Sequence, residues 1–298
     1  MNVSSNAVPA IEFRNVSISF DDVRALQNVS FSLGKGEMIC LTGDSQSGKS
    51  VLLRLAIGFL QPDEGEIWIN GQNITGLDET ELLAVRRGLM GMVFQENALF
   101  TGQTVYENAA YRLTDQEWPE EEIEKSVLEV LTFVGLQNDL EKQAEALSGG
   151  MKRRLELARA LIGWPKIMLY DEPTAGLDPI NAHQVMDLII RARDLHGISS
   201  LYVTKMLGEI SYLANHRAEQ SQDIWTIVPV GAAVADINVM LLEEGRIAFF
   251  GSPQEFHQSP LPAVQHMLHP VTDALHDNLE VADPWAQNRR SRDKNFLG

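Results

Sequence analysis

Residues 38–55 read MICLTGDSQSGKSVLLRL, and this stretch decides the fold. Within it, residues 43–50 fit the pattern G-x-x-x-x-G-K-[ST], a loop whose main-chain N–H groups surround the phosphates of a nucleotide. The apolar run before the loop is typical of a strand buried on both faces of a parallel sheet, and Leu52, Leu53 and Leu55 indicate a helix after it. Because a helix N-terminus attracts anions, this strand, loop and helix predict a phosphate site in an α/β fold.

The side chains of the loop suggest how a nucleoside triphosphate is held. Lys49 is placed to reach the β- and γ-phosphates, and the hydroxyl of Ser50 is a ligand for Mg²⁺. A Gly- and Ser-rich turn without a ligand is the alternative, and the apolar flanks argue against it. The predicted nucleotide contacts of this segment are Gly43, Asp44, Ser45, Gln46, Ser47, Gly48, Lys49, Ser50 and Val51.

Two acidic residues follow a second apolar run at residues 167–170. Asp171 at the end of this predicted strand is placed to hold Mg²⁺, and Glu172 can accept a proton from an attacking water molecule. An adjacent pair of carboxylates after a strand can also mark the start of a helix. The Pro173 and Asp178-Pro179 that follow favour the catalytic interpretation.

A third segment, Leu147-Ser148-Gly149-Gly150-Met151, precedes a basic, alanine-rich helix predicted over residues 151–161. A hydroxyl and main-chain N–H groups at a helix N-terminus suit an anion. Together with Gln95 and Asp178, the segment completes a series of motifs in the order found in ABC ATPases, and residues 11–251 resemble that family. The resemblance implies a P-loop NTPase with a RecA-like parallel core sheet, an antiparallel β side sheet and a helical subdomain.

The resemblance also implies cofactors, a partner and further site residues. ATP and Mg²⁺ are expected, bound in a head-to-tail dimer of two copies in which Ser148, Gly149 and Gly150 of one copy meet the γ-phosphate held by the other. Phe20 occupies the position that stacks on adenine, although taken alone it is more typical of a core or edge aromatic residue. Gln95 is expected to sense Mg²⁺ and water, and Asp178 joins the nucleotide-binding set.

Two residues depart from the family pattern. Gln46 stands where the loop usually has glycine, and Lys205 stands where the family usually has a histidine that contacts the γ-phosphate. Lys205 either supplies a positive charge to that phosphate or is a solvated lysine without a catalytic role. The expected catalytic residues are Glu172, Lys205 and Gln95, and the expected metal ligands are Ser50, Gln95 and Asp171. A slow or inactive regulatory subunit remains the alternative to an ATPase.

The chain divides into a predicted cassette over residues 11–258 and a helical or polar extension over residues 259–298. A helical subdomain is expected at about 97–160, where Pro119 opens one helix. About twenty additional residues near 218–238, including Trp225 and Ile227, predict an inserted hairpin.

Composition narrows the environment and the partners. The net charge of −17 argues against nucleic acid, because nucleic-acid binders cluster Lys and Arg. The single Cys40 excludes an internal disulfide and is expected to be a buried thiol. Without a basic, apolar leader or an apolar run of about 20 residues, the protein is expected in the cytoplasm, peripheral on the inner membrane.

Two segments, residues 95–108 and 151–160, resemble the ATPases of Mla/Mce-type lipid transporters. This resemblance implies an integral-membrane permease, a lipid-binding protein with an Mce domain, and phospholipid or another hydrophobic solute as cargo. Leu99 and Phe100 are the expected contacts with the permease, unless they belong to the subdomain core. A soluble ABC protein acting on ribosomes or DNA is a further alternative.

Overall fold

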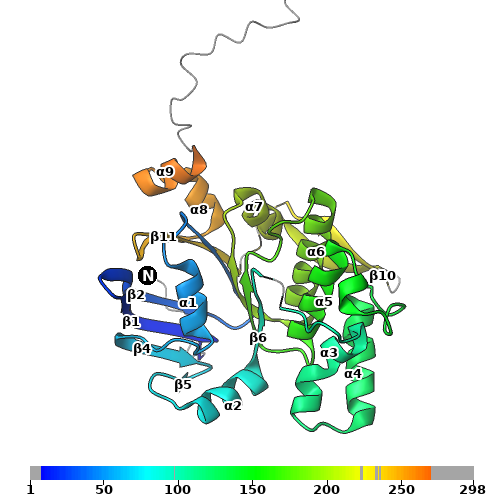
Figure 1. The fold of residues 1–298 in the computed structure, drawn as a ribbon. Coiled ribbons are helices and arrows are strands. Elements are labelled where there is room, and N and C mark those ends of the chain that lie inside the picture. Colours follow the sequence, from blue (N-terminus) through cyan, green and yellow to red (C-terminus); the bar gives the residue numbers. More distant parts are fainter. Residues whose placement is uncertain (1–7, 97, 222–223, 232–233, 235, 270–298) are drawn as a thin grey trace, which may run out of the picture.

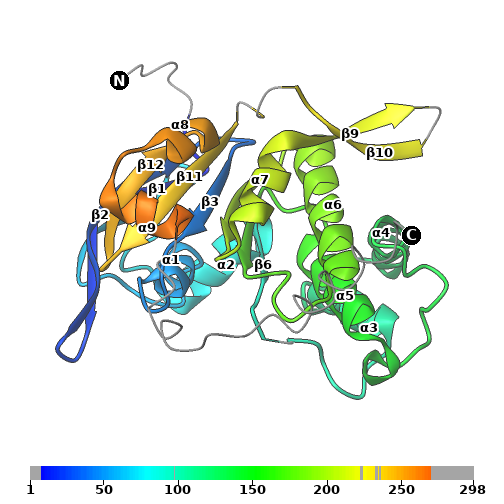
Figure 2. The ribbon, with the colours of Figure 1, turned by 90° about the horizontal axis from the view of Figure 1, so that it is seen from above.

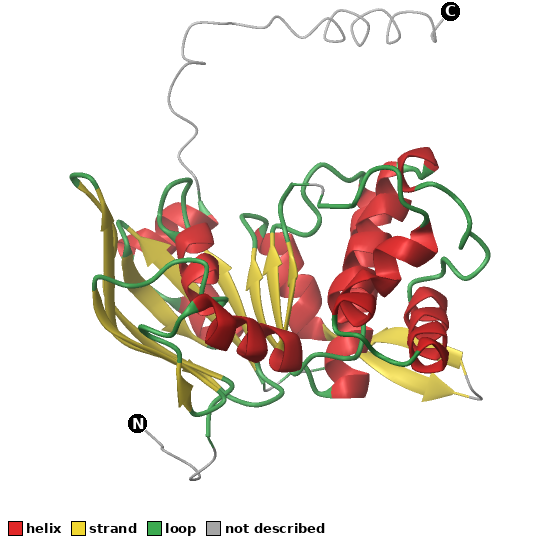
Figure 3. Ribbon diagram, turned by 60° about the horizontal axis from the view of Figure 1, so that its bottom comes forward, coloured by secondary structure: helices red, strands yellow, loops and turns green. Residues whose placement is uncertain are grey.

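The computed structural model describes residues 8–96, 98–221, 224–231, 234 and 236–269. It contains a central sheet, an antiparallel sheet at one end and a helical subdomain at the other (Figures 1 and 3). Most of the predicted extension, residues 270–298, lies outside the described residues.

The central sheet has six strands in the order β12-β11-β3-β8-β7-β6. Their bounds are β3 Met38–Thr42, β6 Met90–Val93, β7 Ile167–Asp171, β8 Ser199–Val203, β11 Ile237–Glu243 and β12 Arg246–Gly251. All pairs are parallel except β11 with β12. Every residue of β3, β7 and β8 is buried, as expected of interior strands in a parallel sheet. The predicted parallel core is therefore confirmed.

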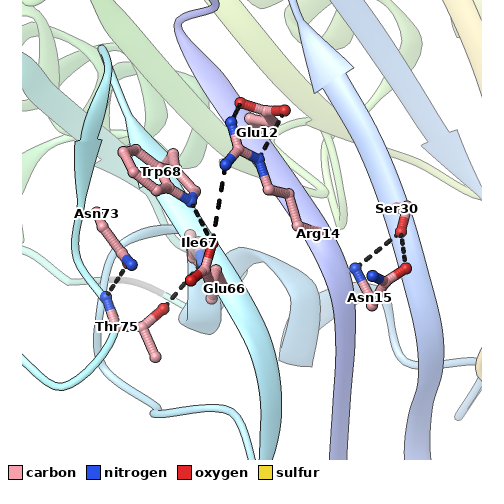
Figure 4. A network of polar contacts seen from close by, with 9 residues as sticks. All are labelled: Glu12, Arg14, Asn15, Ser30, Glu66, Ile67, Trp68, Asn73 and Thr75. Carbon is pink, nitrogen blue, oxygen red and sulfur yellow. Dashed lines mark hydrogen bonds and ion pairs between the residues drawn. The ribbon is translucent and has the colours of Figure 1, made fainter.

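The antiparallel sheet has the order β2-β1-β4-β5, with bounds β1 Ile11–Phe20, β2 Val23–Leu33, β4 Glu64–Ile69 and β5 Gln72–Asn73. Apolar residues alternate along β1, and Phe13 stacks on Phe31 with ring centroids 4.8 Å apart. Polar side chains of the same sheet form a separate network, in which the Arg14 guanidinium lies 4.5 Å from the Trp68 ring and pairs with Glu12 (Figure 4). The alternation confirms the predicted side sheet.

Helices cover the central sheet. They are α1 Lys49–Ala56, α2 Glu79–Leu89, α6 Pro179–His196, α7 Leu207–Asn215, α8 Pro253–Gln258 and α9 Pro262–Leu268. Helix α2 is not predicted from the sequence, although Asp78 and Glu81 form a capping box at its start. None of the described helices combines the length and hydropathy needed to span a membrane.

The helical subdomain contains α3 Val105–Asp115, α4 Glu120–Phe133, the short 3-10 helix η1 Ala144–Ala146 and α5 Gly149–Leu161. Thr104 and Glu107 form a capping box that starts α3, while Pro119 stands at the N-cap position of α4 without a side-chain hydrogen bond. Helix α5 begins two residues before the predicted Met151, because the Ser148 side chain accepts a hydrogen bond from the Met151 N–H.

The additional hairpin consists of β9 His216–Ser221 and β10 Ile224–Pro229, so it starts before the predicted residue 218 and ends well before residue 238. It lies beside one end of α6 and extends away from the central sheet (Figure 2). Arg193 of α6 donates to the main-chain oxygen of His216 at 2.8 Å, and Asp194 accepts from the N–H of Ala218 at 2.7 Å. These contacts join the hairpin to the core.

Candidate functional site

The predicted motifs meet at the carboxyl edge of the central sheet, because β3, β8, β7 and β6 are neighbours and parallel. Residues after these four strands surround one cavity of about 340 Å³. Its lining consists of Val23, Ala25, Ser45, Gln46, Gly48, Lys49, Ser50, Val51, Gln95, Glu172 and Lys205. Crevices of this kind at the carboxyl ends of parallel strands are the usual ligand sites of α/β folds.

Two glycines let the loop pass close to neighbouring main chain. Gly43 has φ of +141°, and a Cβ atom there would lie 2.2 Å from the carbonyl oxygen of Leu242. Gly48 has φ of +103°, and its Cβ would lie 2.6 Å from the carbonyl oxygen of Ala25. Because an L side chain fits neither position, the pattern of the loop follows from its packing as well as from its ligand.

Gln46 keeps the left-handed backbone of the loop without being glycine, with φ of +71°. Such a conformation costs a residue with a side chain roughly 1–2 kcal/mol. Gln46 nevertheless lines the cavity. The departure from the family pattern at Gln46 is therefore accompanied by local backbone strain.

Lys49 is buried against its own loop. Its Nζ donates to the carbonyl oxygens of Gly43 and Asp44 at 2.8 and 2.5 Å and to Ser47 Oγ at 3.1 Å. Burial lowers the pKa of Lys49, and the nearby charge of Lys205 lowers it further. Gly43, Asp44 and Ser47 thus hold Lys49 rather than line the cavity. A polyanion in the cavity would stabilise both ammonium groups.

Ser50 and Asp171 lie together, with Ser50 Oγ donating to Asp171 Oδ1 at 3.4 Å. Burial is the main cause that raises the pKa of Asp171. A cation beside this carboxylate would therefore offset the free-energy cost of keeping it charged away from water. Mg²⁺ typically takes one or two protein oxygens and completes its shell with water and phosphate. The described residues include no group of three or more His, Cys, Asp or Glu side chains able to hold a metal, and this hydroxyl and carboxylate fit Mg²⁺ bound together with a nucleotide.

Glu172 and Lys205 form an ion pair across the cavity wall, with Lys205 Nζ 3.0 Å from Glu172 Oε1. The Glu172 side chain is 17% exposed and that of Lys205 is 45% exposed. Glu172 has φ of +46°, a strained conformation, and its N–H donates to the carbonyl oxygen of Val203 at 3.1 Å. The main chain therefore fixes the position from which this carboxylate projects.

A second, larger cavity of about 570 Å³ shares Glu172 and Lys205 with the first. Its lining is largely apolar and comes from the segment after β7, from α6 and from α7, and includes Leu177, Met186 and Tyr212. The ion pair thus separates two spaces. The buried Glu209 carboxylate behind it accepts hydrogen bonds from Tyr202, Thr204 and Thr174.

Gln95 follows β6 and lines the nucleotide cavity. Arg153 of α5 holds this segment by donating to the carbonyl oxygens of Phe94 at 2.8 Å and Gln95 at 3.1 Å. The same guanidinium pairs with Glu156 at 2.7 Å, and both side chains are buried. This connection cannot be predicted from the sequence, because main-chain carbonyl acceptors are common to every residue type.

Several expected site residues lie away from the cavity within one chain. Phe20 at the end of β1 is 43% exposed and does not line it, whereas Val23 and Ala25 of β2 do, and no motif marks these two. Ser148 and Gly149 are exposed at the start of α5.

Gly150 of α5 instead packs against α6, and Asp178 lies at the start of α6. Gly150 is buried, and a Cβ there would lie 2.0 Å from Asn181 Oδ1. Asp178 caps α6 by accepting from the N–H groups of Ile180 and Asn181. The Asn181 side chain also donates to the Asp178 carboxylate, and this hydrogen bond, followed by the main-chain ones, lowers the pKa of Asp178.

Comparisons with known proteins agree with this geometry. The sequence profile of the ABC transporter family matches residues 26–175. The methionine import ATP-binding protein MetN of Carboxydothermus hydrogenoformans is 38% identical over 70% of this chain and 62% of its own length. The glycine betaine/carnitine transport ATP-binding protein GbuA of Listeria monocytogenes is 34% identical over 79% of this chain and 54% of its own. The chloroplastic protein TRIGALACTOSYLDIACYLGLYCEROL 3 of Arabidopsis thaliana is 37% identical over 86% and 72%.

Solved structures show the same fold. The dimeric structure of MJ0796, described as a bacterial ABC transporter cassette, superposes with a TM-score of 0.69 at 27% identity, covering 82% of this chain and 98% of that one. The chain spans 62% and 54% of the lengths of MetN and GbuA, so the match to them concerns their shared cassette. The chain therefore belongs to the ABC transporter family, as an ATP-binding cassette with the ATPase fold of that family.

Proposed function

We propose that the chain binds ATP with Mg²⁺ and hydrolyses it to drive a membrane transporter, working as a head-to-tail dimer. The observation that carries the proposal is the single cavity lined by Lys49, Ser50, Gln95 and Glu172, beside which Asp171 lies. These side chains come from three places along the chain: the start of α1 after β3, the segment after β6, and the end of β7. Their convergence supplies a phosphate cradle, a metal position and a proton acceptor in one place.

The arrangement suits phosphoryl transfer to water. Lys49 and the loop N–H groups bind the phosphate oxygens, and Ser50 with Asp171 would hold Mg²⁺, whose charge neutralises those oxygens when it is bound. Glu172 accepts a proton as the water oxygen forms its bond to the γ-phosphorus and the bond to the β-phosphate oxygen breaks. Gln95, which lines the same cavity after the neighbouring strand β6, contributes an amide to position the water.

The dimer explains why the start of α5 lies outside the cavity of its own chain. Ser148 Oγ and the N–H of Gly149 are exposed at the N-terminus of a helix of thirteen residues, where an anion is favoured. We assign them, with Gly150 and Asp178, to the ATP bound by a second copy. The dimeric state of the MJ0796 cassette supports this assignment.

A groove of about 340 Å³ between the core and the helical subdomain suits the permease. Its apolar side chains include Phe59 and Tyr111, which are 51% and 47% exposed, and Arg86 lies over the Phe59 ring. Of the two expected contacts, Phe100 lines this groove and Leu99 packs against the core. A cytoplasmic helix of a permease fits the groove and would hold the cassette on the inner face of the inner membrane.

We also propose what kind of molecule the transporter carries. We assign a phospholipid or another hydrophobic solute, with an Mce-domain partner, on the motif at residues 95–108. The Arabidopsis relative named after trigalactosyldiacylglycerol, a glycolipid, supports a lipid. Methionine, glycine betaine/carnitine and spermidine/putrescine appear in the names of other relatives, so a small polar solute is the second candidate.

Purification of the tagged chain from detergent-solubilised membranes tests the assignment. Mass spectrometry of the bound proteins and lipids should find a permease, a protein with an Mce domain and phospholipid. A permease with a substrate-binding protein and no lipid would favour the polar solute, and the absence of any permease would refute a transporter role. A Tyr111→Glu variant, altered in the groove, should lose the permease while still binding ATP.

ATPase measurements on the same complex test the catalytic role. Glu172→Gln should abolish steady-state turnover while ATP still binds, because the amide cannot accept the proton. Undetectable turnover that Glu172→Gln leaves unchanged would instead favour the regulatory alternative.

A further inference from the structure

We propose that Lys205 restrains Glu172 through their ion pair until a nucleoside triphosphate binds, and that the γ-phosphate then draws the ammonium away and frees the carboxylate. The proposal rests on the proposed role of Glu172 as proton acceptor. Lys205 is thus a positioning residue that acts through Glu172 and distinguishes triphosphates from diphosphates.

The geometry of the pair favours one carboxylate position. Lys205 Nζ lies 3.0 Å from Glu172 Oε1, and a carboxylate that accepts such a bond is held by it. The main chain before Lys205 is fixed, since the N–H of Thr204 donates to the carbonyl oxygen of Leu41 at 3.1 Å and its hydroxyl donates to the buried Glu209 at 2.7 Å. Both ends of the ion pair therefore project from firmly held backbone.

Lys205 also faces the phosphate space. It lines the nucleotide cavity together with Lys49, and its charge contributes to lowering the pKa of Lys49, so the two ammonium groups act on the same region. Lys49 is buried and donates to three oxygens of its own loop. The Lys205 side chain is 45% exposed on a flexible stem, so it changes partners more readily than the buried Lys49.

Competition between two anions follows from this placement. A γ-phosphate carries more charge than the Glu172 carboxylate and lies in the cavity that Lys205 lines, so it attracts the ammonium more strongly. ADP lacks that group and leaves the ion pair closed. Glu172 is therefore released only when the nucleotide carries a γ-phosphate, the group that hydrolysis removes.

A double-mutant cycle on affinity tests the exchange. Binding of the nonhydrolysable analogue adenylyl imidodiphosphate and of ADP, each with Mg²⁺, is measured by calorimetry for the unsubstituted chain, K205M, E172Q and the K205M/E172Q double variant. Because E172Q removes the competing carboxylate, it should raise triphosphate affinity more when Lys205 is present. The excess should be roughly threefold to fivefold, the contribution of a partly exposed ion pair. For ADP the cycle should show no excess.

The two refuting outcomes differ from the outcomes that test hydrolysis. Equal gains from E172Q with and without Lys205 would mean that the pair persists on binding or that Lys205 is a solvated lysine. An excess of the same size for ADP would show that the γ-phosphate is not the trigger. The steady-state rate of E172Q separately tests whether Glu172 is the proton acceptor, so either idea can fail alone.

A measurement on the unsubstituted sequence provides a second test, in which a variant serves only to assign one signal. After reductive ¹³C-methylation of the lysines, the dimethyl signal that K205R removes should shift with the triphosphate analogue and stay unchanged with ADP. An unchanged Lys205 signal with both nucleotides would overturn the proposal.

Discussion

Replacement of Arg153 by Met should destabilise the cassette by about 3–5 kcal/mol near neutral pH, the cost of breaking a buried ion pair by removing one partner. Arg153 is 7% exposed and Glu156 is 6% exposed, so the carboxylate left behind cannot reach water without local opening. The guanidinium also donates to Phe94 and Gln95, and these oxygens lose a charged donor. Unfolding by urea, extrapolated linearly to water, measures the loss.

The loss should depend on pH with a definite sign. Burial raises the pKa of Glu156 above 4.5, and the charge of Arg153 opposes this rise. Without Arg153 the pKa in the folded state rises further, so the folded variant keeps a proton that the unfolded chain has released. Stability therefore falls as pH rises from the unfolded value through the folded one. The variant should recover part of its stability at about pH 5 relative to about pH 7.5.

Two further variants make the test specific to the buried charge. Adding Glu156→Gln to Arg153→Met should restore most of the stability, because a neutral amide leaves no unpaired charge. Arg154→Met is the matched control: Arg154 is the next arginine of α5 and donates to the main-chain oxygens of Val134 and Gly135, so it should cost only about 1 kcal/mol. Equal losses for the two arginines, or no rescue by Glu156→Gln, would refute the reasoning.

Three other perturbations have defined outcomes. Burial raises the pKa of Cys40 to about 12, so the thiol should react with Ellman's reagent only after unfolding, and rapid labelling of the native protein would contradict its burial. Gly43→Ala should lower the melting temperature and abolish ATP binding because of its contact with Leu242, whereas Gly149→Ala, with open space around it, should leave the melting temperature nearly unchanged. Gln46→Gly should stabilise the fold by about 1 kcal/mol in urea unfolding by removing left-handed strain, and a loss of stability would show that the side chain contributes more than its backbone costs.

The parallel core was predictable from sequence because its strands are buried on both faces. Residues 38–41 and 167–170 form apolar runs, and each run leads directly into a polar motif, so the motifs had to gather at one edge. The ion pair of Lys205 with Glu172 was not predicted. Both residues were expected in the site, but the distance between their side chains depends on the register of β8 against β7, which short apolar runs do not reveal.

Some residues that line the cavity belong to no sequence motif. Val23 and Ala25 line the cavity from the start of β2, after the turn that follows Phe20, and neither residue type suggests a ligand. Asp78 and Glu81 did carry the signal of a helix start, and α2 could have been predicted from them.

Strand β6 has a mechanical consequence because it is the last strand of the central sheet and pairs with β7 alone in that sheet. The strand ends at Val93, and the carbonyl oxygens of the next two residues accept hydrogen bonds from Arg153 of the helical subdomain. Gln95 is thus tethered at one end to the sheet and at the other to α5. A displacement of α5 pulls directly on one wall of the nucleotide cavity, and the stiffness of that connection is set by a single guanidinium group.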